Sequence, residues 1–464
     1  MPELFGTARE LARRIASRDL LPSEAVESSL ARLDATEPRL RSFVSVLADR
    51  ARRDAMLADA QLRERKPQGP LFGVPISVKD LIAVGGALLT FGSRSMADNV
   101  APADAVAVER LRHAGAIIIG KTTTSEFGCK AVGESPLTGS TRNPWDVSKT
   151  AGGSSAGAAA SVAAGVTPIA VGTDGGGSIR IPAAMTGLFG VKAQFGRVPV
   201  FPIAANPTLA HVCPIGRDVR DVALLLGVLS GHDGRDPHSA PVAAPDYLAA
   251  CDRDPRKLKI AWSPTFGYAT PDPEVRAIGE AAARTFAELG CVVEEVDAPL
   301  GPDPAAMWTA EFYAGVAARL APTLRDRREL LDPEVAAMVE RALTMDAEAY
   351  GRAVQMRYAF RERLRTFFEG YDLLLSPTLP VAAVDAGVSI PPGFDDRNPV
   401  TWVCYTYPFN LTGQPAASIP AGFTRGRLPV GVQLVARAYR EDDLFAAAAA
   451  FEAARPWAQH RPAL

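Results

Sequence analysis

The sequence predicts an α/β protein organised around a β-sheet. Short apolar runs at residues 74–78, 116–119 and 167–171 have the composition of buried strands and are bounded by glycines. Between the first two, residues 106–111 have the apolar spacing of a helix, so strand and helix alternate. The chain has 464 residues, of which 47% are hydrophobic and 22% charged, so it contains enough apolar material for a large core.

The N-terminal part is expected to begin with helices. Thr7 and Glu10 have the spacing of a capping box, and apolar residues follow on one face. Pro22 suits the first turn of a second helix. Further along, residues 154–165 are almost all Ala, Ser, Gly or Val, which predicts a buried helix that approaches other backbones closely.

The second half of the chain predicts a long helical excursion before the sheet resumes. Residues 231–246 are rich in Gly, Pro, Asp and His, which indicates a surface loop. Helices are expected at residues 274–289 and 332–371, and strands at residues 372–375, 416–419 and 430–435. We therefore expect one domain over residues 1–464, with a core at about 71–220, a helical excursion at about 270–371 and a return to the sheet at about 372–464.

Charge and composition exclude several classes of partner. The 50 basic and 52 acidic residues give a net charge of -2 without a polybasic run, so nucleic acid is not an expected partner. Residues 1–21 lack a signal-peptide core and no stretch looks long and apolar enough to span a bilayer, so we expect no membrane association and a cytoplasmic location. The five cysteines show no C-x-x-C spacing, which fits a reducing compartment. The five histidines form no H-E-x-x-H or comparable cluster, so no metal or other cofactor is expected.

Residues 115–122 match the P-loop pattern G-x-x-x-x-G-K-T. A phosphate loop needs a strand before its first glycine and a flexible turn between the glycines, whereas three isoleucines fill this gap. We therefore expect a strand here in place of a nucleotide site.

A second pattern, G-x-S-x-G at residues 153–157, would make Ser155 the nucleophile of a Ser-His-Asp triad. That arrangement requires a strand directly before the elbow, which residues 150–152 do not predict, and a histidine base downstream. His211 is the histidine that could serve, so this triad stays open as an alternative.

A glycine-rich segment supplies another candidate nucleophile, Ser178. Residues 172–180 follow the expected strand at 167–171, so their glycines lie where a strand ends. Three consecutive glycines allow successive N–H groups to converge on one point, as an oxyanion beside the Ser178 hydroxyl would require. Taken alone, the segment fits a tight loop with a capping serine better.

Three segments together resemble the amidase signature family. They are residues 73–80, with the pattern G-x-P-x-x-V-K-D, residues 152–155, with G-G-S-S, and residues 172–180, with G-[ST]-D-x-G-G-S-[IV]-R. Ser154 and Ser178 stand 24 residues apart (178 minus 154), which is the family's spacing. Further similar segments are residues 115–127, 141–145, 182–184, 190–192, 409–416 and 428–434. The resemblance implies a single large α/β domain with a mixed central β-sheet flanked by helices.

The resemblance also implies a Ser-Ser-Lys catalytic triad made of Ser178, Ser154 and Lys79. Ser178 is then the nucleophile, Ser154 passes its proton, and Lys79 is the base. A serine hydroxyl needs a base to become a nucleophile, and a lysine can accept the proton only when its amine is neutral. Burial among apolar residues lowers the pKa of a lysine, and such residues surround Lys79, provided that strand alternation turns Asp80 aside.

The remaining site residues are expected to shape the loop of the nucleophile. Its oxyanion hole would consist of the backbone N–H groups of Gly175, Gly176, Gly177 and Ser178. The expected supporting residues are Ser155, Asp174 and Arg180. Asp174 and Arg180 are expected to pair and hold the loop, while in the alternative Arg180 binds a substrate carboxylate.

The predicted function is hydrolysis of a small-molecule carboxamide through a Ser178 acyl-enzyme, which releases a carboxylate and ammonia or an amine. One alternative is the glutaminase-type subunit of a tRNA-dependent amidotransferase, although residues 209–215 and Gly175 depart from that subunit's usual sequence. A second alternative is a non-catalytic binding protein on the same fold, against which the intact triad argues. A homodimer is left open.

The sequence does not identify the substrate-binding residues. Two groups rich in aromatic residues either form a wall for aryl or arylalkyl amides or pack in the core, and core packing explains such groups more often. They are Met307, Trp308, Phe312 and Tyr313, and Trp402, Tyr405 and Tyr407.

Overall fold

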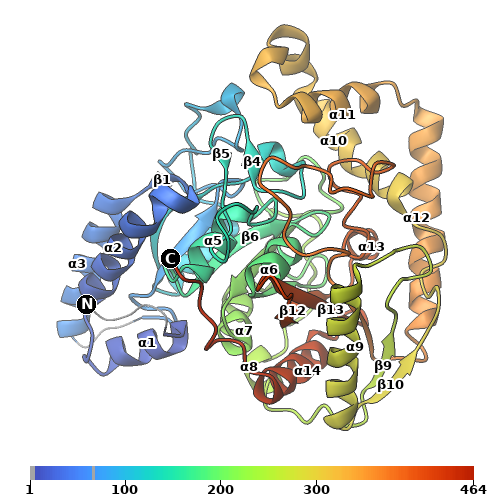
Figure 1. Cartoon of the computed structure of the whole chain (residues 1–464). Coiled ribbons are helices and arrows are strands. Elements are labelled where there is room, and N and C mark those ends of the chain that lie inside the picture. The colour runs from blue at the N-terminus through green and yellow to red at the C-terminus, as the bar shows by residue number, and fades with distance from the viewer. Residues whose placement is uncertain (1–5, 65–67) are drawn as a thin grey trace.

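The computed structural model describes residues 6–64 and 68–464 (Figure 1). The helices are α1 (Ala8–Ala16), α2 (Pro22–Leu40), α3 (Ala48–Arg63), α4 (Val106–His113), α5 (Ala156–Ala163), α6 (Arg180–Thr186), α7 (Val219–Leu229), α8 (Tyr247–Ala250), α9 (Pro273–Glu288), α10 (Ala305–Asp326), α11 (Pro333–Leu343), α12 (Ala347–Phe367), α13 (Pro408–Thr412) and α14 (Glu441–Ala454). The strands are β1 (Phe43–Val46), β2 (Pro75–Lys79), β3 (Ile117–Thr122), β4 (Glu134–Ser135), β5 (Gly139–Ser140), β6 (Ile169–Asp174), β7 (Phe189–Lys192), β8 (His211–Gly216), β9 (Lys259–Trp262), β10 (Val292–Glu295), β11 (Leu373–Pro377), β12 (Ala416–Phe423) and β13 (Pro429–Ala436).

One large sheet runs through the described part of the chain. Its eleven strands lie in the order β1-β3-β2-β6-β8-β7-β12-β13-β11-β9-β10. Strands β3, β2 and β6 are mutually parallel, as are β11, β9 and β10, whereas the pairs between β6 and β11 are antiparallel. The pairing of β12 with β7 joins the late strands to the early ones, so the chain folds as one α/β unit with a mixed sheet, as predicted.

Both faces of the central strands are buried, and the alternation of side chains along these strands fills separate cores on the two faces. In β11, Leu373 and Leu375 belong to the core on one face, while Leu374 belongs to the core on the other. In β6, Ile169 and Val171 face the first core and Ala170 packs against α5 and α6. A sheet covered on both sides needs apolar residues at successive positions, which is why its strands appear as continuous apolar runs in the sequence.

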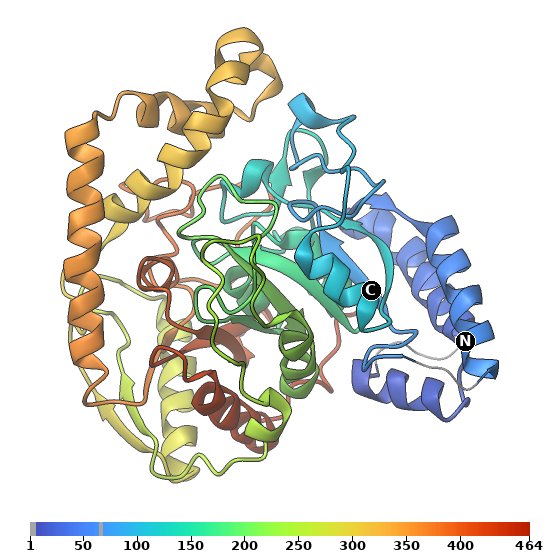
Figure 2. The same cartoon turned by 180° about the vertical axis from the view of Figure 1, so that it is seen from behind.

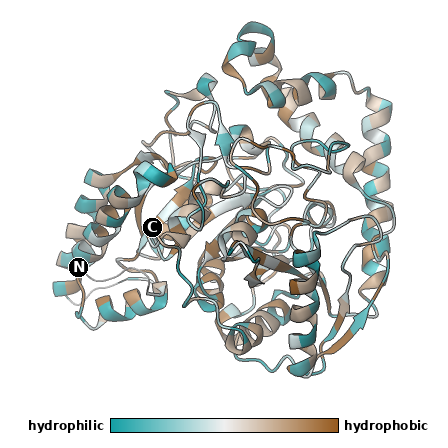
Figure 3. Cartoon of the chain, in the orientation of Figure 1, coloured by the Kyte–Doolittle hydropathy of each residue, from teal (hydrophilic) through white to brown (hydrophobic). Residues whose placement is uncertain are grey.

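Helices cover the sheet in distinct groups. Figure 1 shows α1–α3 at one end of the molecule and α10–α12 at the other, with α5 and α6 near the middle. In the view from behind, Figure 2 shows α7 and α14 packed together near the lower part of the sheet. The hydrophilic residues gather on outer helices such as α2 and α3 in Figure 3. Among the described residues, none of the helices combines the length and apolar composition needed to cross a bilayer.

Several local predictions are confirmed. The Thr7 hydroxyl accepts a hydrogen bond from the N–H of Glu10 at 3.0 Å and caps α1, and α2 begins at Pro22. Residues 117–122 form β3, so the P-loop match is a buried strand. Every residue of α5 is buried, and a Cβ on Gly157 would lie 2.1 Å from the Ser42 carbonyl oxygen, as expected of a helix in close backbone contact.

The segment 270–371 is less uniformly helical than its sequence indicates. It contains β10, whose four residues pair in parallel with β9 at the edge of the sheet. Two valines followed by two exposed glutamates give little strand signal, because an edge strand is not buried on both faces. Residues 231–246 form neither helix nor strand, in agreement with the predicted loop.

Candidate active site

The end of β2 places Lys79 beside three hydroxyl groups. Because β2, β3 and β6 are parallel, their carboxyl ends meet at one edge of the sheet. The Lys79 side chain is fully buried there, and its Nζ lies 2.7 Å from Ser154 Oγ, 3.0 Å from Ser155 Oγ and 2.8 Å from Thr173 Oγ1. Lys79 and Ser154, which are 75 residues apart in sequence, are thus in direct contact.

The surroundings of Lys79 favour its neutral form. Burial lowers the pKa of Lys79 to about 7, and the nearby Asp174 opposes the shift only in part. Its neighbour Asp80 points to the other side of the strand, where it accepts a hydrogen bond from Lys121 Nζ at 2.9 Å. Strand alternation therefore turns Asp80 aside as expected, and Lys79 keeps a usable lone pair near neutral pH.

The hydrogen bonds of Ser155 make it a hydrogen-bond acceptor toward Lys79. Ser155 Oγ donates its proton to the carbonyl oxygen of Thr173 at 3.1 Å, so it can only accept from Lys79. A neutral amine has two N–H groups and one lone pair. If Thr173 Oγ1 accepts the second N–H, the lone pair is directed at Ser154.

Side chains from other segments hold the glycine loop after β6 through hydrogen bonds to its carbonyl groups. The Gly175 carbonyl accepts from Trp308 Nε1 at 2.9 Å, and the Gly176 carbonyl accepts from Thr406 Oγ1 at 2.7 Å. The Asp174 carbonyl lies 3.1 Å from His211 Nδ1. Because C=O and N–H point in opposite directions in a trans peptide, these contacts turn the N–H groups of Gly175 and Gly176 away from the anchoring side chains.

Gly177 differs from the two glycines before it. Its N–H donates to Asp174 Oδ1 at 2.8 Å and is therefore occupied in this conformation. Its φ of 128° lies in a region that favours glycine, and a Cβ here would lie 2.3 Å from Thr406 Oγ1. Gly177 thus serves as a turn that brings Ser178 to the surface of the cavity.

Asp174 and Arg180 form a buried pair that supports the loop. Arg180 Nε and Nη2 bond to the two carboxylate oxygens of Asp174 at 3.0 and 2.9 Å. The other N–H groups of Arg180 donate to the Thr406 carbonyl, Gln433 Oε1 and Asn410 Oδ1. Although burial acts to raise it, the pKa of the Asp174 carboxyl is held well below its usual range by Arg180. Since all five donors of the guanidinium are used, the alternative in which Arg180 binds a substrate carboxylate is wrong.

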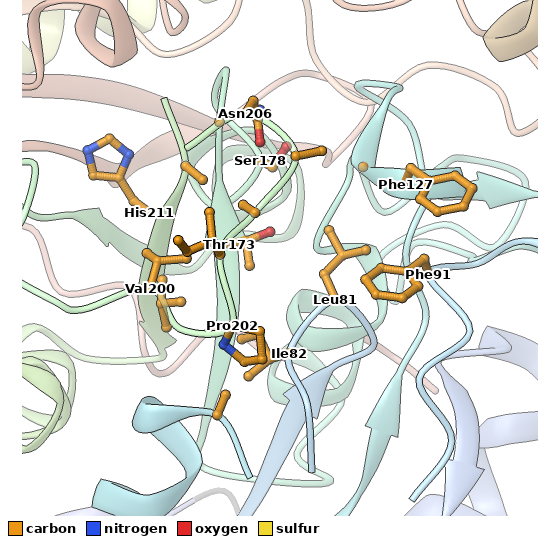
Figure 4. A pocket seen from close by; sticks show the side chains of 18 of the residues that line it. Leu81, Ile82, Phe91, Phe127, Thr173, Ser178, Val200, Pro202, Asn206 and His211 are labelled. Atoms are coloured by element: carbon orange, nitrogen blue, oxygen red, sulfur yellow. The ribbon is translucent and has the colours of Figure 1, made fainter. Parts of the chain in front are cut away.

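A cavity of about 150 Å³ opens beside Ser178, and Ser154, Thr173 and Gly175 also line it. In Figure 4, Ser178 and Asn206 lie at one end, Phe91 and Phe127 on one side, and Val200 and Pro202 near the opposite side. The Ser178 hydroxyl has no hydrogen bond to any described residue, so the Ser154–Ser178 step of the relay is not formed in this conformation.

The two groups rich in aromatic residues pack mostly in the core, which is the alternative that the sequence favours. Of their seven residues only Phe312 lines the cavity, and the other six are buried among one another. The rest of the aromatic lining comes from Phe91, Phe127 and Phe201, which lie outside the α-helices and the strands. These residues carry no periodic signal, and their side chains meet only after the chain has folded.

The Ser155–His211 alternative is not formed. Ser155 precedes α5 without a strand before it, and Lys79 Nζ is its side-chain partner. His211 lines the cavity, but its Nδ1 lies 2.8 Å from the Leu209 carbonyl oxygen, and burial lowers its pKa well below the usual value. The described part of the chain contains no cluster of His, Cys, Asp or Glu side chains placed to hold a metal ion.

Comparison with known proteins agrees with the geometry. The family model described as Amidase matches residues 24–445. An acylamidase of Rhodococcus erythropolis is 38% identical over 98% of this chain and 97% of its own length, and a glutamyl-tRNA(Gln) amidotransferase subunit of Moorella thermoacetica is 36% identical over 99% and 98%. The solved structure of a bacterial aryl acylamidase of the amidase signature family superposes with a TM-score of 0.93, at 31% identity over 99% of this chain and 98% of that one.

Proposed function

This chain belongs to the amidase family and hydrolyses carboxamides, and we propose that it does so through an acyl-enzyme on Ser178. The observation that carries the proposal is the contact of the buried Lys79 amine with hydroxyl groups alone, 2.7 Å from Ser154. A base without a carboxylate partner at this position can deprotonate a serine near neutral pH.

The proposed chemistry moves one proton along Ser178, Ser154 and Lys79. As Ser178 Oγ attacks the carbonyl carbon, its proton passes to Ser154, and the proton of Ser154 passes to Lys79. The resulting ammonium returns a proton through Ser154 to the leaving nitrogen when the C–N bond breaks. Water then attacks the acyl-enzyme, loses a proton to the same relay, and releases the carboxylate and the free Ser178 hydroxyl.

The oxyanion of each tetrahedral intermediate is proposed to bind the N–H groups of Gly175, Gly176 and Ser178. Such a donor typically contributes about 3 kcal/mol to the stability of the transition state. Gly177, also expected from the sequence, would have to release Asp174 before it could donate to the oxyanion.

The glutaminase-type subunit is the second candidate, because a relative of that kind is 36% identical. The cavity argues against it, since glutamine carries an ammonium group and the acidic residue of the lining, Asp174, is already paired with Arg180. Production of ammonia from glutamine faster than from aryl amides by the isolated chain would favour this candidate.

The experiment that tests the proposal compares Ser178→Ala with Ser155→Ala on a panel of anilides and primary amides. Ser178→Ala should lower kcat/KM by at least about 10⁴-fold and abolish labelling by a fluorophosphonate, because the nucleophile is lost. Ser155→Ala should retain the label. An active and labelled Ser178→Ala enzyme would rule out the proposed nucleophile.

A reducing, cytoplasmic location is also proposed, supported by five buried cysteines that are all free thiols. A homodimer is proposed as its assembly state. Light scattering of the purified protein tests it.

A further inference from the structure

Two phenylalanines in the cavity wall have unusual backbone conformations. Phe91 has φ 53° and Phe127 has φ 48°, in the left-handed region that costs a bulky residue about 1–3 kcal/mol. Their rings are stacked with centroids 5.6 Å apart, and both line the cavity that contains Ser178. Conformations of this cost persist only where the surrounding structure enforces them.

Buried carboxylates hold both turns. Asp80 accepts from the N–H of Thr90 at 3.0 Å, directly before Phe91. Glu126, directly before Phe127, accepts from Ser93 Oγ at 2.7 Å and from the N–H of Asp332 at 2.8 Å. The two turns are also joined directly, because the N–H of Phe127 donates to the Phe91 carbonyl at 2.8 Å. The rings are therefore fixed in place before any substrate arrives.

Arg319 of α10 covers this pair of rings. Its guanidinium carbon lies 4.4 Å from the Phe91 centroid and 5.9 Å from that of Phe127. The residue is exposed and lines the cavity. Among the described residues, no carboxylate or carbonyl oxygen is hydrogen-bonded to its guanidinium. Asp174, the acidic residue of the lining, is already neutralised by Arg180.

A guanidinium stacked on an aromatic ring can still bind a ligand through its N–H groups. The ring occupies one face of the group, while its N–H groups remain free around the edge. A carboxylate is the planar partner that binds two such N–H groups at once. The cavity that Arg319 lines is mainly apolar and includes Leu89, Phe312 and Val316. Recognition here would require a ligand with an apolar body and one anionic end.

We propose that Arg319, Phe91 and Phe127 form a specificity subsite for amides that carry a carboxylate on an apolar, aryl-sized group. The proposal rests on the function assigned to Ser178. A cavity of about 150 Å³ accommodates a group the size of a benzene ring. The stacked phenylalanines contact that group, and Arg319 binds the carboxylate at the mouth.

Binding to a catalytically inactive protein tests the subsite independently of turnover. Calorimetry on Ser178→Ala would compare 3- and 4-acetamidobenzoate with 4-methylacetanilide, whose methyl group replaces the carboxylate. We expect at least one benzoate to bind about tenfold more tightly than the neutral anilide, as one charge-assisted contact allows. Adding Arg319→Met should remove this preference, and Arg319→Lys should keep part of it.

Arg325→Met is the matched control, because Arg325 is exposed on the same helix and does not line the cavity. It should leave both affinities unchanged. Equal binding of charged and neutral ligands in the parent protein, or an equal loss of both in Arg319→Met, would overturn the subsite. Neither result bears on the nucleophile, which the activity and labelling of Ser178→Ala test separately.

Discussion

Two buried lysines on neighbouring strands have opposite surroundings. Lys79 ends β2 and lies in register with Thr122, while Lys121 lies one position earlier on β3, in register with Val78. Both side chains are fully buried. Lys121 Nζ bonds to Asp80 at 2.9 Å and to the Leu88 carbonyl at 3.0 Å, whereas Lys79 meets three hydroxyl groups.

The difference shows that burial alone does not make a lysine a base. Burial lowers the pKa of Lys121 too, but the Asp80 carboxylate favours the ammonium and opposes the shift. Lys79 has only dipoles in hydrogen-bond contact, and its pKa falls to about 7. The Asp80–Lys121 pair instead holds the turn at Thr90 that presents Phe91. At the end of β2, Lys79 therefore serves catalysis, while its neighbour Asp80 supports the wall of the cavity.

Replacing each lysine by methionine should separate these roles and produce the largest effects. Lys79→Met should lower kcat/KM by about 10³–10⁴-fold through loss of the base, with little loss of stability because no buried carboxylate loses its cation. Lys121→Met should lower the free energy of unfolding by about 3–5 kcal/mol, since Asp80 is left buried without its cation.

Urea unfolding and steady-state kinetics of both variants check this contrast. The kinetics of Lys121→Met are measured where it remains folded, and kcat/KM should stay within about tenfold of wild type because no catalytic group is lost. If Lys79→Met were the less stable variant and Lys121→Met the less active one, the assignment of roles would be reversed.

The pH dependence should show the same distinction. Because Lys79 acts as a base only when neutral, kcat/KM should rise with pH through an apparent pKa near 7 and then level off. Burial and the nearby Arg180 also lower the pKa of Lys192 to about 7. Lys192→Met is therefore the control that shows which of the two lysines causes the rise of kcat/KM with pH. If kcat/KM no longer rises with pH near 7 in Lys192→Met and the enzyme stays active, Lys79 is not the titrating base.

Linkage gives a second readout of Lys79. Its pKa falls from 10.5 in the unfolded chain to about 7 in the fold, so the unfolded state binds more protons between these values. The contribution of Lys79 to the free energy of unfolding should therefore increase as pH rises from about 7 toward 10.5. The difference between wild type and Lys79→Met isolates this contribution.

The triad could be predicted from the sequence, but the lining of the cavity could not. Lys79, Ser154 and Ser178 each stand in a short contiguous pattern. The parallel strands β2 and β6 bring the patterns of Lys79 and Ser178 to one edge of the sheet, and the loop before α5 brings Ser154 into contact with Lys79. The subsite depends on contacts between distant segments: Ser93 with Glu126, and Phe91 with Arg319. Such contacts arise from tertiary packing, and no local periodicity encodes them.

The strands that the sequence did not predict have local causes. β8 contains Pro214, which lowers the strand signal although the strand is central. β9 has only four residues and begins with the exposed Lys259. In contrast, β2, β3 and β6 contain apolar runs because they are buried on both faces, and the sequence predicts their bounds within three residues.

Thr173→Val should give the smallest effect and tests how the hydroxyl groups divide the protons of Lys79. The ammonium form can donate to all three hydroxyls, whereas the neutral amine donates to two. Removing the Thr173 acceptor thus costs the charged form more, and the kinetic pKa should fall below that of wild type. The maximal kcat should fall about three- to tenfold, because a less constrained amine is aligned with Ser154 for less of the time.

Thr122→Val provides the matched control for Thr173→Val. Thr122 lies in register with Lys79 at the end of β3, is more deeply buried than Thr173, and its hydroxyl has no hydrogen-bond partner in the described structure. The same loss of one hydroxyl should leave both the kinetic pKa and kcat unchanged. A kinetic pKa that rises in Thr173→Val would mean that Thr173 donates to the lone pair of Lys79, and the lone pair would then not be free for the proton of Ser154.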